Sequence, residues 1–165
     1  MKLNELGYDH WFESHARGIC REEHRIARVT AVDRGRYNLI NEKGEFPAEL
    51  TGKFLYASES PDDLPCVGDW VCIQDFESEN FAIIHEILPR KSFLRRKTSG
   101  KNIDFQMIAS NIDKAFIVQS CDFNFNIRRL ERYLVMANEG HIEPMIILTK
   151  TDLTPCVVGH RGVGK

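Results

Sequence analysis

Short stretches of alternating apolar and polar residues, separated by turn residues, run through the first half of the chain. Such alternation is typical of β-strands with one buried face. The predicted strands are residues 26–32, 37–40, 46–50, 67–73 and 81–88, with a loop over residues 58–65. Five short strands favour a closed barrel of the OB type, because closure removes exposed sheet edges; an SH3-like barrel is the main alternative.

We expect the strands of this barrel, between residue 25 and about residue 88, to be antiparallel and to share one hydrophobic core. The expected core residues are Val29, Leu39, Trp70 or Val71, and Ile83 or Ile84. Residues 1–24 place aromatic side chains among polar ones, which predicts an N-terminal arm or a short helix.

The second half of the chain has a strand–helix–strand pattern. Residues 114–120 and 144–148 are apolar runs typical of buried strands, and residues 127–139 have helical spacing that ends before Gly140. This order predicts a βαβ unit with parallel strands and a right-handed crossover. The residues expected on the inner face of the helix are Leu130, Leu134 and Ala137, with Tyr133 and Val135 as further candidates.

The composition is that of a soluble globular protein, with 42% hydrophobic residues, 28% charged residues and a net charge of −2. No apolar run approaches the roughly 18 residues of a membrane span, and residues 1–7 resemble neither a secretory signal nor a transit peptide. We expect a cytoplasmic location, no membrane partner and a monomer.

The cysteines and histidines suggest no metal site. The five cysteines form an odd set without a C-x-x-C pair, so we expect them to be reduced and mostly buried. The six histidines are dispersed, and none has a carboxylate or cysteine at metal-ligand spacing. We therefore assign no metal-ligand residue in this chain, and the catalytic residue stays unknown.

A phosphate-binding pattern, G-x-x-x-x-G-K, follows the apolar stretch at residues 156–158. Its glycines let several backbone N–H groups point at one phosphate chain, and its lysine adds a positive charge. The alternative is a glycine-rich turn or tail, and His160 occupies an x position, where a catalytic base is not expected. The candidate phosphate-binding residues are Gly159, His160, Arg161, Gly162, Val163, Gly164 and Lys165.

A second motif, Thr149-Lys150-Thr151-Asp152, directly follows the predicted strand at residues 144–148. The carboxylate of Asp152 can accept hydrogen bonds from guanine N1–H and the exocyclic amine, a donor pair that adenine lacks. The stem of Lys150 can lie along the base. A solvated turn is the alternative, but two such motifs after apolar strands favour a guanine-nucleotide site at the ends of a sheet.

The guanine motif precedes the phosphate motif, which is the reverse of the usual order. With this order and the barrel, the chain resembles the circularly permuted GTPases known as ribosome small-subunit-dependent GTPase A. The resemblance is continuous from about residue 26 to residue 153 and resumes over residues 156–165. The stretches that carry it are residues 95–97, 106–113, 122–126, 129–134 and 144–153.

The resemblance implies a fold of mixed class: an N-terminal five-stranded OB-type barrel and then a partial α/β P-loop GTPase domain. It divides the chain into an arm (1–24), the barrel (25–90), a basic linker (91–104) and part of a circularly permuted GTPase domain (105–165). It also implies binding of GTP or GDP with Mg²⁺ and hydrolysis of GTP. The implied role is late maturation of the small ribosomal subunit, with the barrel against its rRNA.

The chain departs from the family pattern in several places. Thr149 stands where Asn is more usual, and the Mg²⁺-binding Ser/Thr and the ligands of a C-terminal zinc region are absent from this sequence. Parallel strands need a crossover of about a dozen residues, which the interval between Asp152 and Gly159 does not provide. We therefore expect an abridged form that has lost residues between Leu153 and Cys156, and that binds nucleotide poorly and hydrolyses it hardly at all.

Two other functions remain open at this stage. A non-catalytic RNA-binding OB-fold protein with a remnant nucleotide domain is the main alternative, and an ATP-using P-loop protein is the other.

A basic run between the predicted domains suits phosphate contacts, although a solvated linker explains it equally well. Its residues are Arg90, Lys91, Arg95, Arg96, Lys97 and Lys101.

Overall fold

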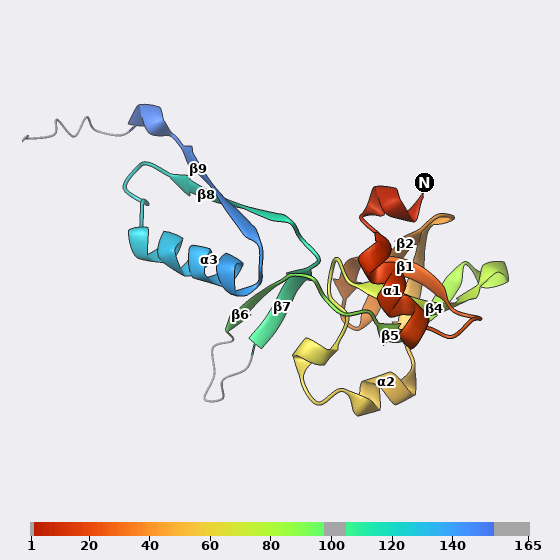
Figure 1. The fold of residues 1–165 in the computed structure, drawn as a ribbon. Coiled ribbons are helices and arrows are strands. Elements are labelled where there is room, and N and C mark those ends of the chain that lie inside the picture. Colours follow the sequence, from red (N-terminus) through yellow and green to blue (C-terminus); the bar gives the residue numbers. More distant parts are fainter. Residues whose placement is uncertain (1, 98–104, 154–165) are drawn as a thin grey trace, which may run out of the picture.

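The first half of the chain forms a closed β-barrel (Figure 1). The structure, a computed structural model, describes residues 2–97 and 105–153. The barrel strands follow one another in the order β1-β2-β3-β5-β4 and close between β4 and β1. Their bounds are β1 Arg25–Asp33, β2 Arg36–Asn41, β3 Gly44–Leu50, β4 Trp70–Phe76 and β5 Phe81–Ile87. The predicted barrel is confirmed.

The expectation that all five strands are antiparallel is wrong for one pair. Strands β3 and β5 run parallel, with Ala48 opposite Ala82 and Leu50 opposite Ile84. The other neighbouring pairs in the barrel are antiparallel. The reason is geometric, because a closed ring with an odd number of strands cannot alternate direction at every step.

The barrel interior is one hydrophobic cluster that includes Val29, Leu39, Val71 and Ile84, as predicted. Trp70 is also fully buried but belongs to a second cluster outside the barrel. Both faces of β4 are therefore covered, since its first four residues are all buried. This is why the sequence there reads as a continuous apolar run rather than as an alternating one.

The N-terminal segment folds onto the barrel as helices. A short 3-10 helix, η1 (Leu3–Leu6), precedes α1 (His10–Ile19), whose N-cap Asp9 accepts hydrogen bonds from the backbone N–H groups of Trp11 and Phe12. Phe12 is 2% exposed and packs in the second cluster with Trp70. The apolar side of α1 thus covers the outer face of β4.

The expectation that all cysteines are reduced is wrong for one pair. Cys20, directly after α1, forms a disulfide with Cys72 of β4, and their Cα atoms are 5.6 Å apart. The two residues are 52 positions apart, so no local pattern could reveal the pair. Cys66 is a free, buried thiol whose pKa burial raises to about 12, and Cys121 is half-buried. Cys156 lies outside the described residues.

The connection between β3 and β4 is more ordered than predicted. It contains the helix α2 (Gly52–Ala57) and the 3-10 turn η2 (Pro61–Asp63), both capped by side-chain oxygens at their N-termini. Residues 67 and 68, predicted as strand, form a turn instead, and β4 begins at Trp70. A Cβ atom on Gly68 would lie 2.1 Å from the carbonyl oxygen of Ser110, and its φ is +94°, so the turn requires glycine. A further 3-10 turn, η3 (Glu77–Glu79), joins β4 to β5.

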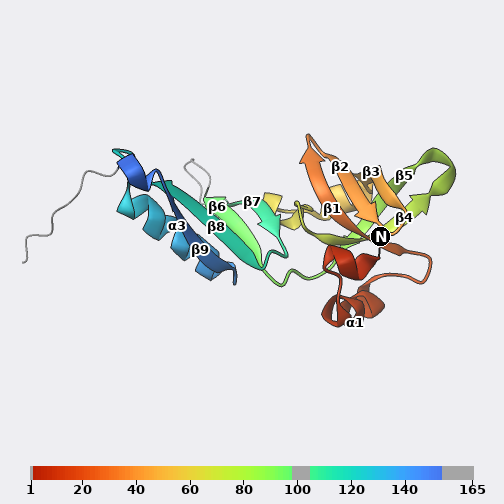
Figure 2. The same ribbon diagram turned by 90° about the horizontal axis from the view of Figure 1, so that it is seen from above.

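The second half consists of a hairpin and a βαβ unit, and the hairpin lies between the unit and the barrel (Figure 2). The hairpin strands are β6 (Phe93–Lys97) and β7 (Phe105–Ser110), so the segment predicted as a linker begins with a strand. The βαβ unit comprises β8 (Lys114–Ser120), α3 (Ile127–Glu139) and β9 (Glu143–Thr149), followed by the 3-10 turn η4 (Thr151–Leu153). The predicted parallel pairing of β8 and β9 is confirmed.

The helix α3 buries Leu130 and Ala137 and half-buries Leu134, as predicted. Tyr133 and Val135, the further candidates for its inner face, are 45% and 54% exposed. The handedness of the crossover and the boundaries of the domains stay predictions. Within residues 2–97 and 105–153, no helix has the length and apolarity needed to cross a membrane.

A buried ion pair connects the barrel to the hairpin. Asp69 is 0% exposed, and its carboxylate accepts hydrogen bonds from Arg90 Nε at 2.8 Å and Nη2 at 2.7 Å. It also accepts from the hydroxyl of Ser110 in β7 and from the backbone N–H of Cys66. One carboxylate thus holds the turn before β4, the segment after β5 and the end of β7 together.

Candidate nucleotide site

The C-terminal ends of β8 and β9 lie side by side, because the strands are parallel and Ser120 is paired with Thr149. The backbone N–H of Cys121 donates to the carbonyl oxygen of Thr149 at 2.8 Å, which extends the pairing by one step. Loops that carry polar side chains therefore leave the sheet at the same edge. In α/β folds, ligands bind at this edge.

The predicted guanine-reading residues lie where the sequence placed them. Thr149 is the last residue of β9, and Lys150 follows with a left-handed φ of +53°, which turns the chain sharply. Thr151 and Asp152 then form the turn η4, with exposed side chains. The predicted placement after the strand is confirmed, with one 3-10 turn in place of an irregular loop.

Asp122, in the loop after β8, fixes the position of Lys150. Its carboxylate accepts hydrogen bonds from the Lys150 ammonium at 3.0 Å, the backbone N–H of Asn124 at 2.9 Å and the Ser120 hydroxyl at 2.9 Å. The hydrogen bond from Asn124, then those from Lys150 and Ser120, lower the pKa of Asp122 to about 2. The carboxylate therefore stays charged at neutral pH and holds the Lys150 side chain across the edge of the sheet.

Residues 122–126 carry part of the family resemblance, but the sequence alone predicted no role for them in the site. A second set of contacts fixes the same loop, since Asn126 caps α3 by accepting from the backbone N–H of Arg129. The Arg129 guanidinium in turn donates to the carbonyl oxygen of Asn124 at 2.8 Å. The sequence does contain a signal for this loop: an acidic residue two positions after a buried strand, followed by an asparagine that caps the next helix.

A cleft of about 890 Å³ opens between the two loops. Its walls are largely apolar. Phe123, which is 95% exposed, and Phe125, which is 47% exposed, come from the loop after β8, and Leu148 comes from β9. Lys150 and Asp122 supply charge, whereas Asp152 lies just outside the lining, in the same turn as Leu153. Flat apolar surface beside a charged, hydrogen-bonding turn suits a planar heterocyclic base.

The candidate phosphate-binding residues, Gly159 through Lys165, lie outside the described residues, so their distance from Asp152 is not defined. Among residues 2–97 and 105–153, no group of three or more His, Cys, Asp or Glu side chains could hold a metal ion. The described part of the chain therefore offers no cluster of three such ligands for a zinc ion, and no residue of it is assigned to Mg²⁺.

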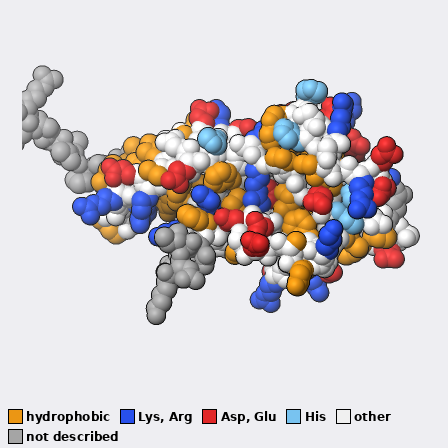
Figure 3. All heavy atoms as spheres, turned by 60° about the horizontal axis from the view of Figure 1, so that its bottom comes forward, with side chains coloured by type: hydrophobic (Ala, Val, Ile, Leu, Met, Phe, Trp, Pro, Cys, Tyr) orange, Lys and Arg blue, Asp and Glu red, His pale blue; other side chains and the backbone are white. Residues whose placement is uncertain are grey.

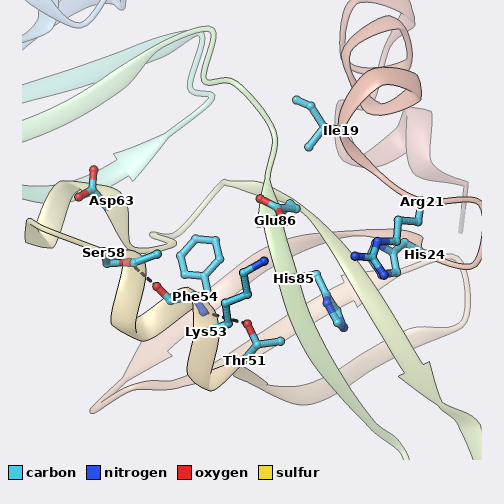
Figure 4. A pocket seen from close by; sticks show the side chains of 11 residues that line it. Ile19, Arg21, His24, Thr51, Lys53, Phe54, Ser58, Asp63, His85 and Glu86 are labelled. Carbon is cyan, nitrogen blue, oxygen red and sulfur yellow. Dashed lines mark hydrogen bonds between the residues drawn. The ribbon is translucent and has the colours of Figure 1, made fainter.

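The barrel carries a second pocket, of about 420 Å³, between α2, β5 and the segment after α1 (Figure 4). His24 and His85 lie ring against ring with centroids 4.4 Å apart, and Arg21, Lys53 and Glu86 line the same pocket. Burial, then the neighbouring His24 and Arg21, lowers the pKa of His85 below its ordinary value of 6.5.

This environment predicts a pH-dependent contribution to stability. His85 has a lower pKa in the folded chain than in the unfolded chain, so the unfolded chain binds the proton first as the pH falls. The contribution of His85 to the free energy of unfolding is therefore complete above about pH 6.5 and is lost as the pH falls through the lowered pKa of the folded chain. We expect the free energy of unfolding of the wild type, relative to His85→Gln, to decrease from about pH 8 to about pH 5. Denaturant unfolding of both proteins across this range tests it, and a difference that does not change with pH contradicts it.

On the face shown in Figure 3, Lys and Arg side chains are mixed with Asp and Glu side chains over most of the surface. This agrees with the small net charge of −2. Any electrostatic binding by the chain therefore depends on local clusters rather than on one large field.

Comparison with known proteins gives a consistent result. The family model described as RsgA GTPase matches residues 87–160. The small ribosomal subunit biogenesis GTPase RsgA 1 of Bacteroides thetaiotaomicron is 46% identical over 126 residues, which cover 76% of this chain and 35% of that protein. The RsgA of Opitutus terrae is 34% identical over 164 residues, with 94% of this chain and 44% of that protein covered. The chain thus spans less than half the length of these relatives.

Two solved structures share the fold. The chain resembles YloQ, a circularly permuted GTPase, with a TM-score of 0.58 and 24% identity, covering 81% of this chain and 43% of YloQ. It resembles YjeQ from Thermotoga maritima with a TM-score of 0.59 and 20% identity, covering 80% of this chain and 43% of YjeQ. Together, the barrel, the βαβ unit and the sequence identity to the curated relatives show that the chain belongs to the RsgA GTPase family.

Proposed function

We propose that this chain serves as a GTP-binding and GTP-hydrolysing factor in late maturation of the small ribosomal subunit, with its barrel against rRNA. The observation that carries the proposal is the position of Thr149–Asp152 at the C-terminal edge of the β8–β9 sheet, beside an apolar cleft. The names of the relatives, small ribosomal subunit biogenesis GTPases, support the cellular role. A cytoplasmic monomer that requires no membrane fits this role.

In this proposal the two loops at the sheet edge read the base. The Asp152 carboxylate accepts from the two guanine donors, and the Lys150 stem lies along the ring, held at its far end by Asp122. Thr149 and Thr151 frame this turn. Because the Lys150 ammonium already contacts Asp122, base binding costs less ordering of that long side chain.

The phosphate chain belongs to Gly159–Lys165 in the same proposal, with the side chains of His160, Arg161 and Val163 at the variable positions. Hydrolysis is the in-line attack of water on the γ-phosphate, and loop amides and Lys165 stabilise the charge that develops on the phosphate oxygens. No described residue is assigned as the group that orients water.

Titration of the chain with fluorescent GTP, GDP and ATP analogues tests the proposal. We expect GTP and GDP to bind more tightly than ATP, because only guanine offers two donors to Asp152. Lys165→Ala should weaken all three nucleotides by a similar factor, since it removes a phosphate contact alone. Equal affinity for ATP and GTP contradicts base reading, and no binding of any nucleotide contradicts nucleotide binding by this chain.

A further inference from the structure

A groove of about 810 Å³ runs between the β6–β7 hairpin and α3, on the half of the chain that carries the nucleotide site. The hairpin and the helix lie side by side there (Figure 1). Its lining residues from the hairpin are Arg95, Lys97 and Phe105. The main lining residues from the helix are Arg128, Glu131, Arg132, Val135 and Met136.

The walls of this groove are fixed against each other. The backbone N–H of Phe93 in β6 donates to the carbonyl oxygen of Gly140, just after α3, at 3.0 Å. A Cβ atom on Gly140 would lie 1.7 Å from the carbonyl oxygen of Phe93, so only glycine allows this approach. The groove is therefore formed before any ligand binds, which reduces the entropic cost of binding.

The groove carries more positive than negative charge. Four cationic side chains line it, against the two carboxylates of Glu131 and Glu139. Among the described residues, Lys97, Arg128 and Arg132 make no ion pair within 4.0 Å, in contrast to the paired Lys114 and Lys150. Three cations on two facing elements thus remain available to an anionic ligand.

Arg95 is held in place at the centre of the cationic wall. Its guanidinium carbon lies 4.2 Å from the centroid of the Phe105 ring and 5.1 Å from that of Phe93. Its Nη1 atom lies 3.6 Å from Oδ2 of Asp62. Its Nε atom is buried and has no hydrogen-bond partner among the residues the structure describes.

The remaining lining is apolar. Phe105, Val135 and Met136 lie between the cations, and Val135 is 54% exposed although it was expected on the inner face of α3. Apolar surface next to spaced cations matches single-stranded nucleic acid, whose bases pack on apolar and aromatic side chains while its phosphates contact Lys and Arg.

We propose that this groove binds a single-stranded segment of RNA, separately from the barrel. The choice of RNA over an acidic peptide rests on the proposed function, in which the partner is a ribosomal subunit, and on the aromatic and apolar lining, which a chain of carboxylates would not use. Lys97, Arg128 and Arg132 contact phosphates, and Arg95 adds positive charge to the wall that faces them.

Fluorescence anisotropy of the whole chain with a labelled single-stranded RNA of about a dozen nucleotides tests this proposal. Lys97→Ala, Arg128→Ala and Arg132→Ala should each weaken binding about fivefold at about 0.1 M salt. Each should also make the slope of log K against log salt shallower by about 0.7, the value for one lost contact to a single strand. The triple variant should lose about two orders of magnitude in affinity.

Arg17→Ala is the control, because Arg17 is an exposed cation on α1 that does not line the groove. Arg21→Ala with Lys53→Ala removes cations from the barrel pocket instead. If only the barrel variant loses RNA, the RNA-binding role stands and the groove proposal is wrong. If the wild type binds no RNA, both are wrong. Equal binding of a labelled polyglutamate peptide, lost in the triple variant, identifies an acidic-protein site and also overturns the proposal.

Discussion

Asp152→Asn, made in a full-length version of this protein, is expected to lower the affinity for GTP by about one to two orders of magnitude. The substitution replaces a charged acceptor by a neutral amide, so guanine loses charge-assisted hydrogen bonds that are worth about 1.5–3 kcal/mol. It also places an amide donor opposite a guanine donor. Because the Asp152 side chain is exposed in η4, the substitution should not disturb folding. A loss of GTP affinity would therefore report the lost contacts to the base.

The same variant should bind xanthine nucleotides better than the wild type does. Xanthine has a carbonyl where guanine has its exocyclic amine, and that carbonyl accepts from the new amide. Titration of both proteins with GTP, XTP and ATP measures the preference, and Asp33→Asn, an exposed carboxylate on the barrel, is the matched control. An unchanged ratio of GTP to XTP affinity in Asp152→Asn would show that Asp152 does not read the base.

Asp69→Ala is expected to reduce the free energy of unfolding by about 3–5 kcal/mol, because it leaves a largely buried cation without its partner. The Arg90 side chain is only 18% exposed, and its Nε would lose its acceptor. The Ser110 hydroxyl and the Cys66 backbone N–H would lose theirs as well. Denaturant unfolding measures the change.

Two further variants separate this explanation from others. Glu13→Ala removes an exposed ion pair with Arg17 on α1, and we expect it to lower the free energy of unfolding far less than Asp69→Ala does, because solvent screens the pair. The double variant Asp69→Leu/Arg90→Met should recover much of the lost stability, because it leaves no charge buried alone. If Asp69→Ala lowers the free energy of unfolding no more than Glu13→Ala does, the buried pair has no stabilising role.

The sequence predicted those elements whose formation depends on local pattern. The barrel strands, the helix α3 and the strands β8 and β9 carry strong periodicity, and Gly140 marks the end of the helix. The parallel β3–β5 pair, the Cys20–Cys72 disulfide and the burial of Asp69 depend on residues that meet only in the folded chain. No window of sequence contains both partners of these contacts.

The candidate site divides in the same way. Lys150 and Asp152 were found because a short motif after a strand predicts both the place and the chemistry. Asp122 was not found, because its role comes from the parallel pairing that brings the end of β8 next to the end of β9. The sequence of β6 predicts part of a linker, because its two apolar residues are followed directly by three basic ones.

The closure of the barrel has a consequence for the speed at which it forms. Hairpins β1–β2 and β2–β3 join residues that are close in the chain, whereas closure pairs Arg28 with Trp70 and Ala48 with Ala82. Each distant pair must overcome the entropy of closing a long loop before it gains contacts. The meander β1–β2–β3 can therefore form early and reversibly, and the rate of folding is governed by the later arrival of β4 and β5 that completes the ring.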